Sequence, residues 1–137
     1  MKRTPIRRGT KGLARTGNLK PRSATKAKID RQRSAMFAPL AEAGEPCRAG
    51  ARIVAHEQAR GKTHLCTGVA ACFHELRKRS SGGSTVNPKN LLPVCWNCNN
   101  WAEDWPDYAK ELGLVIREGH PLWDEVSKRH DRKGSAA

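Results

Sequence analysis

The feature that most constrains the fold is the cysteine pair in Cys95-Trp96-Asn97-Cys98. Two thiolates separated by two residues can hold one tetrahedral zinc ion at a tight turn, and a structural site needs two further ligands. The chain has 137 residues, which leaves room for one small domain with a thin hydrophobic core. A domain of that size gains much of its stability from a metal cross-link. The pair therefore predicts a small domain organised around zinc.

The other two zinc ligands must come from upstream residues, where no second C-x-x-C pair occurs. Cys47 and Cys66 are favoured, and Cys72 and His64 are the alternatives. Five cysteines in a chain expected to be cytosolic argue for metal binding before disulfides. A thioredoxin-like redox pair would need a βαβ frame, for which the chain is too short and too basic. The expected structural zinc site is Cys47, Cys66, Cys95 and Cys98.

The charge of the chain indicates its partners. It has 26 lysines and arginines against 13 aspartates and glutamates, a formal net charge of +13. Such an excess attracts polyanions, so nucleic acid is the expected partner, ahead of a ribosomal or membrane-surface role. No apolar run approaches the roughly 20 residues of a membrane span, and the basic N-terminus lacks the apolar segment of a signal peptide. We expect a cytoplasmic protein that binds nucleic acid and has no membrane partner.

Composition divides the chain into three parts. Residues 1–33 contain twelve lysines and arginines, Arg7 and Arg8 among them, and their few apolar residues show no period. This composition predicts a disordered basic arm that contacts phosphates. Residues 34–120 are expected to form the ordered module, and residues 121–137 a polar C-terminal tail.

Within the expected module, the pattern predicts an α+β order of short elements. Pro39 limits the first helix, because proline lacks an N–H donor and clashes with the preceding turn. Pro93 places the second strand at a sheet edge for the same lack of a donor. The expected helices are 34–43, 49–62, 97–105 and 106–114, and the expected strands are 69–76 and 91–96.

Residues 73–106 resemble the HNH endonucleases, especially the small phage-encoded ones that combine a four-cysteine zinc site with a ββα-metal motif. Their sequence is FHELRKRSSGGSTVNPKNLLPVCWNCNNWAEDWP. The shared features are a histidine at a strand end, basic residues, R-S-x-G-G, and NPKNLLPVCWNC leading into a helix. The resemblance covers about residues 37–116. It implies an α+β fold, a zinc-stabilised ββα-metal domain.

The resemblance also assigns roles to single residues. His74 takes the position of a metal ligand, Glu75 that of the base, and Asn90 that of the residue that braces the loop between the strands. Asn99 and Glu103 lie on one helix face, where the family commonly has two metal-binding histidines. The expected phosphate contacts beside the cleavage site are Arg77, Lys78 and Arg79.

Glu75 and the helix ligands depart from the family pattern, which has histidine at these positions. Oxygen ligands suit Mg²⁺ or Mn²⁺ better than Zn²⁺. In a second version the strand register shifts by one residue and His74 is the base. In a third, the catalytic half is degenerate, and the zinc-stabilised frame binds DNA or RNA without cleaving it.

The function that this resemblance implies is metal-dependent hydrolysis of DNA phosphodiester bonds, which leaves 5′-phosphate and 3′-hydroxyl ends. The implied setting is phage DNA processing or packaging in a bacterial cytoplasm. Packaging or replication proteins are the expected protein partners.

Overall fold

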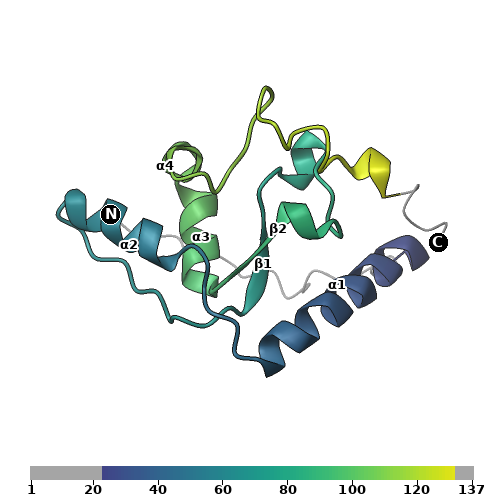
Figure 1. Ribbon diagram of the computed structural model, residues 1–137, viewed down its shortest axis with the longest axis horizontal. Coiled ribbons are helices and arrows are strands. Elements are labelled where there is room, and N and C mark those ends of the chain that lie inside the picture. The colour runs from purple at the N-terminus through teal and green to yellow at the C-terminus, as the bar shows by residue number, and fades with distance from the viewer. Residues whose placement is uncertain (1–22, 132–137) are drawn as a thin grey trace, which may run out of the picture.

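The frame of the domain is a pair of short antiparallel strands followed by a helix. The computed structural model describes residues 23–131 (Figure 1). Strand β1 (Cys72–Glu75) pairs with β2 (Leu91–Val94), so that His74 lies opposite Leu92 and Glu75 opposite Leu91. Helix α3 (Trp96–Asp104) begins directly after β2. Within the described part of the chain these two strands make one sheet, and the domain is a small mixture of helices and strands.

Helix α3 starts where it does because Cys95 caps it. The Sγ atom of Cys95 accepts a hydrogen bond from the N–H of Cys98 at 3.4 Å, which satisfies one of the unpaired donors of the first turn. Helix α4 (Pro106–Glu111) follows after Trp105, with proline in its first turn, where the missing N–H costs nothing. The sequence predicts both strands and both of these helices close to the observed bounds.

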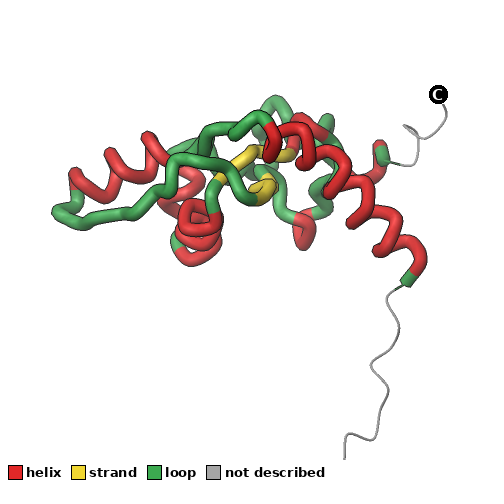
Figure 2. The backbone as a smooth tube through the Cα atoms, turned by 90° about the horizontal axis from the view of Figure 1, so that it is seen from below, coloured by secondary structure: helices red, strands yellow, loops and turns green. Residues whose placement is uncertain are grey.

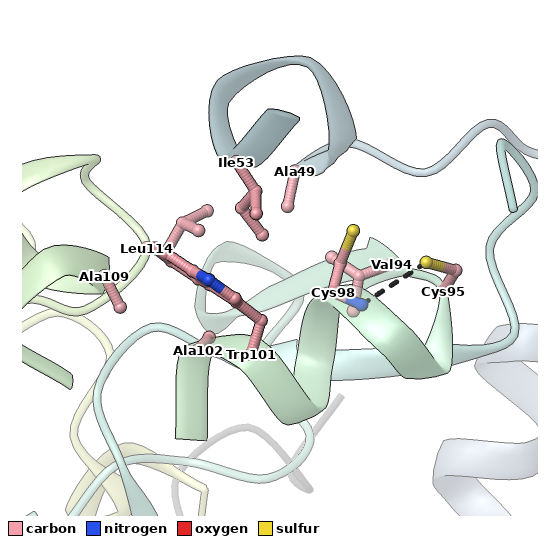
Figure 3. Close-up of a cluster of buried hydrophobic side chains, with 9 residues drawn as sticks. All are labelled: Ala49, Ile53, Val94, Cys95, Cys98, Trp101, Ala102, Ala109 and Leu114. Atoms are coloured by element: carbon pink, nitrogen blue, oxygen red, sulfur yellow. Dashed lines mark hydrogen bonds between the residues drawn. The ribbon is translucent and has the colours of Figure 1, made fainter. Parts of the chain in front are cut away.

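The core lies between α2 (Gly50–Ala59), α3 and the segment after α4 (Figure 3). Ile53 of α2 and Leu114 are fully buried, and Trp101 of α3 is 7 % exposed. Figure 3 shows Ile53 of α2, and Ala49 just before this helix, pointing toward α3. The core is small, and two of its members, Cys95 and Cys98, are cysteines.

Helix α1 (Ala24–Glu42) corrects the predicted boundary between arm and module. Residues 24–33, predicted to be disordered, form the first half of this helix, and Ser23 caps it by accepting from the N–H of Lys26 at 3.2 Å. The helix also passes through Pro39, which the sequence analysis took as a limit. No residue of α1 is buried, and its first half, residues 24–33, has no apolar period to reveal it. The arm residues 1–22 lie outside the described residues.

Figure 2 shows α1 projecting from one side of the domain, and Figure 1 places α2 on the other. Two side chains attach α1 to β1. The ring of Phe37 packs edge-on against Phe73, with centroids 5.1 Å apart, and Arg33 donates to Glu75. Helix α1 is therefore a basic helix that is attached to β1 mainly through Phe37 and Arg33.

The segment expected to be a C-terminal tail folds back on the loop between the strands. Val126 is fully buried and its carbonyl accepts from the N–H of Ser84 at 2.8 Å. A short 3-10 helix, η3 (Lys128–His130), follows. The ordered module thus extends past residue 120, as far as Asp131, whose carboxylate accepts from the hydroxyl of Ser84 at 2.6 Å. Within residues 23–131, no helix has the length and apolar character needed to cross a membrane.

Candidate metal centre and candidate catalytic site

The four cysteines predicted as zinc ligands come together in the structure. Their Sγ atoms all lie within 4.8 Å of one another, and those of Cys66 and Cys95 are 4.0 Å apart. Tetrahedral zinc with Zn–S bonds of about 2.3 Å requires sulfur atoms about 3.8 Å apart. The cluster therefore fits a metal ion such as zinc. The residues are Cys47, Cys66, Cys95 and Cys98.

Three backbone contacts assemble the cluster from distant segments. An isolated antiparallel bridge joins Pro46 to Val69, and the N–H of Cys47 donates to the carbonyl of Gly68 at 3.0 Å. These bonds bring the segments of Cys47 and Cys66 together. The N–H of Cys95 then donates to the Sγ of Cys47 at 3.3 Å, which ties the start of α3 to them.

Hydrogen bonds to the sulfur atom of Cys95 favour its thiolate form, the form that binds metal. Burial alone would raise the pKa of Cys95, but hydrogen bonds from the backbone N–H groups of Thr67 and Cys98 outweigh it and lower this pKa from 9.0 to about 6. Burial, together with the neighbouring thiols, raises the pKa of Cys98. In the metal-free protein Cys95 is thus a thiolate at neutral pH, while a metal must displace the proton of Cys98.

The two alternative ligands lie outside the four-sulfur cluster. The Nε2 atom of His64 is 3.3 Å from the Sγ of Cys98, so His64 contacts one of the four cysteines without belonging to the cluster. Burial lowers the pKa of His64, which favours its neutral form. The thiol of Cys72 donates to the carbonyl of Val94 at 3.6 Å, and burial raises its pKa to about 11.

His74 of β1 directs its side chain toward α3, and the residue is 2 % exposed. Its Nε2 is 2.6 Å from the carbonyl oxygen of Leu114, and since a carbonyl only accepts, Nε2 carries the proton. Its Nδ1 faces the side-chain amide of Asn99 on α3, with Oδ1 at 3.1 Å. Either the ring is doubly protonated or the amide turns its NH₂ toward Nδ1. Metal-binding histidines commonly have this arrangement, one nitrogen donating to a carbonyl and the other toward the ion.

Glu75 faces the opposite side of the strand, because neighbouring residues of a strand alternate. Its Oε1 accepts from Arg33 of α1 and from Arg79 at 2.9 Å each. The carboxylate is 14 % exposed and so lies mostly out of water. The structure therefore brings His74 together with Asn99, and Glu75 together with two arginines.

Glu103 lies one turn beyond Asn99 on α3, and its carboxylate accepts from the Nζ of Lys78 at 2.7 Å. Its side chain is 52 % exposed. Among the described residues, the four cysteines form the one group of three or more His, Cys, Asp or Glu side chains close enough to share an ion. His74, Glu75 and Glu103 do not form a second such group.

Asn90 braces the loop between the strands. Its Oδ1 accepts from the N–H of Arg77 at 2.7 Å, while its Nδ2 donates to the carbonyls of Arg77 and Ser84. The side chain is fully buried. Gly83 has to be glycine here, because a Cβ atom would lie 1.8 Å from the carbonyl oxygen of Arg77. Asn90 thus ties together Arg77 and Ser84, which flank the R-S-x-G-G stretch.

The three residues predicted to contact phosphates have different surroundings. The guanidinium of Arg77 donates to the carbonyls of Ser81 and Trp123 and lies over the ring of Trp123, so it supports the loop. Lys78 is paired with Glu103. Arg79 has a side chain that is 63 % exposed. Arg7 and Arg8 lie outside the described residues.

Sequence reasoning did not single out two partners of this site. Arg33 belongs to the stretch predicted as a disordered arm, yet its guanidinium donates to Glu75. Nothing in this run of basic residues distinguishes Arg33 from its neighbours. Leu114 acts through its carbonyl, and a backbone group has no sequence signature.

Comparisons of the chain with protein-family models, with curated proteins and with solved structures gave no significant match.

Proposed function

We propose that the chain is a metal-dependent DNA endonuclease of the HNH type, with the ββα-metal motif formed by β1, β2 and α3. The observation that carries the proposal is the orientation of His74. The Leu114 carbonyl holds its Nε2–H at 2.6 Å, which directs Nδ1 toward Asn99 of α3. This is how a histidine is held when its second nitrogen serves as a metal ligand.

The proposed set of donors suits a hard divalent cation, Mg²⁺ or Mn²⁺. His74 would offer Nδ1, Asn99 its amide oxygen and Glu103 a carboxylate oxygen. A cation bound there would supply positive charge to the phosphate and lower the pKa of an attacking water. Asn90 braces the loop beside the site, and zinc on the four cysteines would fix the start of the helix that carries Asn99 and Glu103.

Glu75 is the proposed proton acceptor. Its Oε1 atom accepts hydrogen bonds from both Arg33 and Arg79. Its role as a base therefore requires that the two arginines turn toward phosphates when DNA binds, and that the freed carboxylate turns from its own face of β1 toward the water. The phage setting and the partnership with packaging or replication proteins belong to the same proposal.

A second function is favoured by the pairing of the acidic residues. Glu75 and Glu103 are both in ion pairs with basic side chains, and His74 is buried with both nitrogens in hydrogen bonds. In a nuclease that has lost its activity, the former catalytic side chains would be expected to bond to one another's neighbours in this way and not to an ion. On this alternative, the zinc-stabilised frame binds DNA or RNA without cutting it.

A plasmid-nicking assay separates the two functions. The purified protein is incubated with supercoiled DNA and Mg²⁺, Mn²⁺, Ni²⁺ or Zn²⁺, and DNA binding is measured in parallel by gel shift. We expect cleavage with Mg²⁺ or Mn²⁺, and a loss of at least about 10-fold in Glu103→Gln with DNA affinity unchanged. Glu118→Gln, on an exposed turn, is the matched control and should cleave normally.

His74→Ala should abolish cleavage, with zinc content and circular dichroism used to check that the variant is folded. If the wild type shifts DNA but cuts it with none of the four ions, the nuclease proposal is wrong and the binding function stands. If Glu103→Gln cleaves as well as Glu118→Gln, then α3 does not supply the ligand proposed here.

A further inference from the structure

A polar pocket of about 710 Å³ opens between α1 and the segment that follows β1. Four of its lining residues come from α1 at a spacing of about one helical turn, so they share one face of the helix. Three cations against one acid give the lining a net charge of +2. The lining residues are Lys26, Asp30, Arg33, Ser34 and Arg79.

Two of the cations already converge on an anionic oxygen. Arg33 and Arg79, from segments far apart in the sequence, each donate to Oε1 of Glu75 at 2.9 Å. Guanidinium groups in such a pair match the oxygens of a phosphate as well as those of a carboxylate. Arg79 is 63 % exposed and Lys26 is exposed, so a ligand can reach both from solvent.

The openness of the pocket indicates the size of its ligand. A site for a small molecule encloses most of its ligand and is largely apolar, whereas this pocket is open and polar. A phosphate that belongs to a larger molecule fits such a site. Helix α1, 19 residues or about 28 Å long, provides most of the pocket lining and projects from one side of the domain (Figure 2).

We propose that this pocket binds a backbone phosphate of duplex DNA and so docks α1 along the duplex. The inference rests on the proposed function in that DNA is taken as the substrate, but it concerns binding alone. A phosphate in the pocket attracts Arg33 and Arg79, the two donors that now hold Glu75. Docking of the helix is thereby linked to release of the proposed base.

The test is the salt dependence of binding to a short duplex, measured by fluorescence anisotropy without divalent cations so that no cleavage occurs. The variant is Lys26→Ala combined with Arg79→Ala. Arg33 is left in place because it also binds the carbonyl of Thr85. We expect the slope of log Kd against log salt to fall by about one, the loss of one phosphate contact.

The matched control is Lys62→Ala combined with Lys110→Ala, which removes the same charge from exposed positions away from α1. Its slope should stay close to that of the wild type. Equal changes in the two double variants would overturn the proposal, because the cations would then act only through net charge. Zinc content and circular dichroism confirm folding. A wild type that binds with this pattern but never cleaves would refute the nuclease function and leave the pocket assignment intact.

Discussion

Gly50 lies where the cysteine cluster leaves no room for a side chain. It opens α2, and a Cβ atom on it would lie 2.4 Å from the Sγ of Cys66 and 3.8 Å from that of Cys47. Nothing in the local pattern requires glycine at a first helical position, where many residues are accepted. Glycine is needed because the sulfur atoms of the cluster occupy the space of a side chain, so a substitution at this position tests the packing of the cluster.

Gly50→Ala should damage the metal site. The added methyl group forces Cys66 or α2 to move, at a cost of about 1–3 kcal/mol, typical of overpacking. Elemental analysis should show less zinc than the about one ion per chain expected of the wild type, and the thermal midpoint should fall. Ala51→Ser, on the exposed face of the same turn, is the control. A Gly50→Ala protein with full zinc content would contradict the close packing described here.

At this scale the sequence predicts ligands better than it predicts their partners. The four cysteines could be named because thiols at this spacing have few other roles, and the structure brings them together. Asn90 could be placed through the resemblance. The pairing of His74 with the Leu114 carbonyl and of Glu75 with Arg33 could not be predicted, since each depends on how segments some 40 residues apart meet.

Among the elements, α1 differs most from the rest. The strands and α3 are defined by apolar residues, a proline and the capping cysteine, all visible in the sequence. The first half of α1 consists of good helix formers without an apolar stripe, so propensity favours it while periodicity, the stronger signal, is absent. Its order depends on the docking of Phe37 and Arg33 against β1.

Phe37→Ala should therefore loosen α1 without unfolding the domain. An edge-on aromatic pair contributes about 0.5–1.5 kcal/mol, so amide hydrogen exchange in residues 24–42 should rise about 2- to 13-fold or more. Exchange in β1, β2 and α3 should not change, because no residue of α1 belongs to the core. Gln32→Ala, exposed on the same helix, serves as the control. Equal acceleration in all elements would show that α1 is an integral part of the fold.

For the whole molecule, metal binding and folding are linked through protons. The core is small and includes Cys95 and Cys98, so an ion on the cluster cross-links α3, the segment before α2 and the loop of Cys66. Of these parts, α3 carries Asn99, which faces His74. Stability of the domain and geometry of the candidate site should thus depend on the same ion.

The number of protons released per zinc ion should depend on pH. Above its pKa of about 6, Cys95 is already a thiolate in the metal-free protein and releases no proton. Below that pKa it is a thiol, and zinc must displace its proton. Calorimetry in buffers of different ionisation enthalpy should therefore show about one more proton released near pH 5 than near pH 8. A count that does not rise as pH falls would contradict the lowered pKa of Cys95.

Helix α3 has one further consequence. Cys95 caps it and Cys98 lies in its first turn, whereas Asn99 and Glu103 lie beyond them on the same helix. Since the cysteines hold the helix in place, residues 99 and 103 can be exchanged by mutation without loss of the frame. In chains that share this cysteine arrangement, the side chains at these two helix positions can therefore vary while the architecture stays constant.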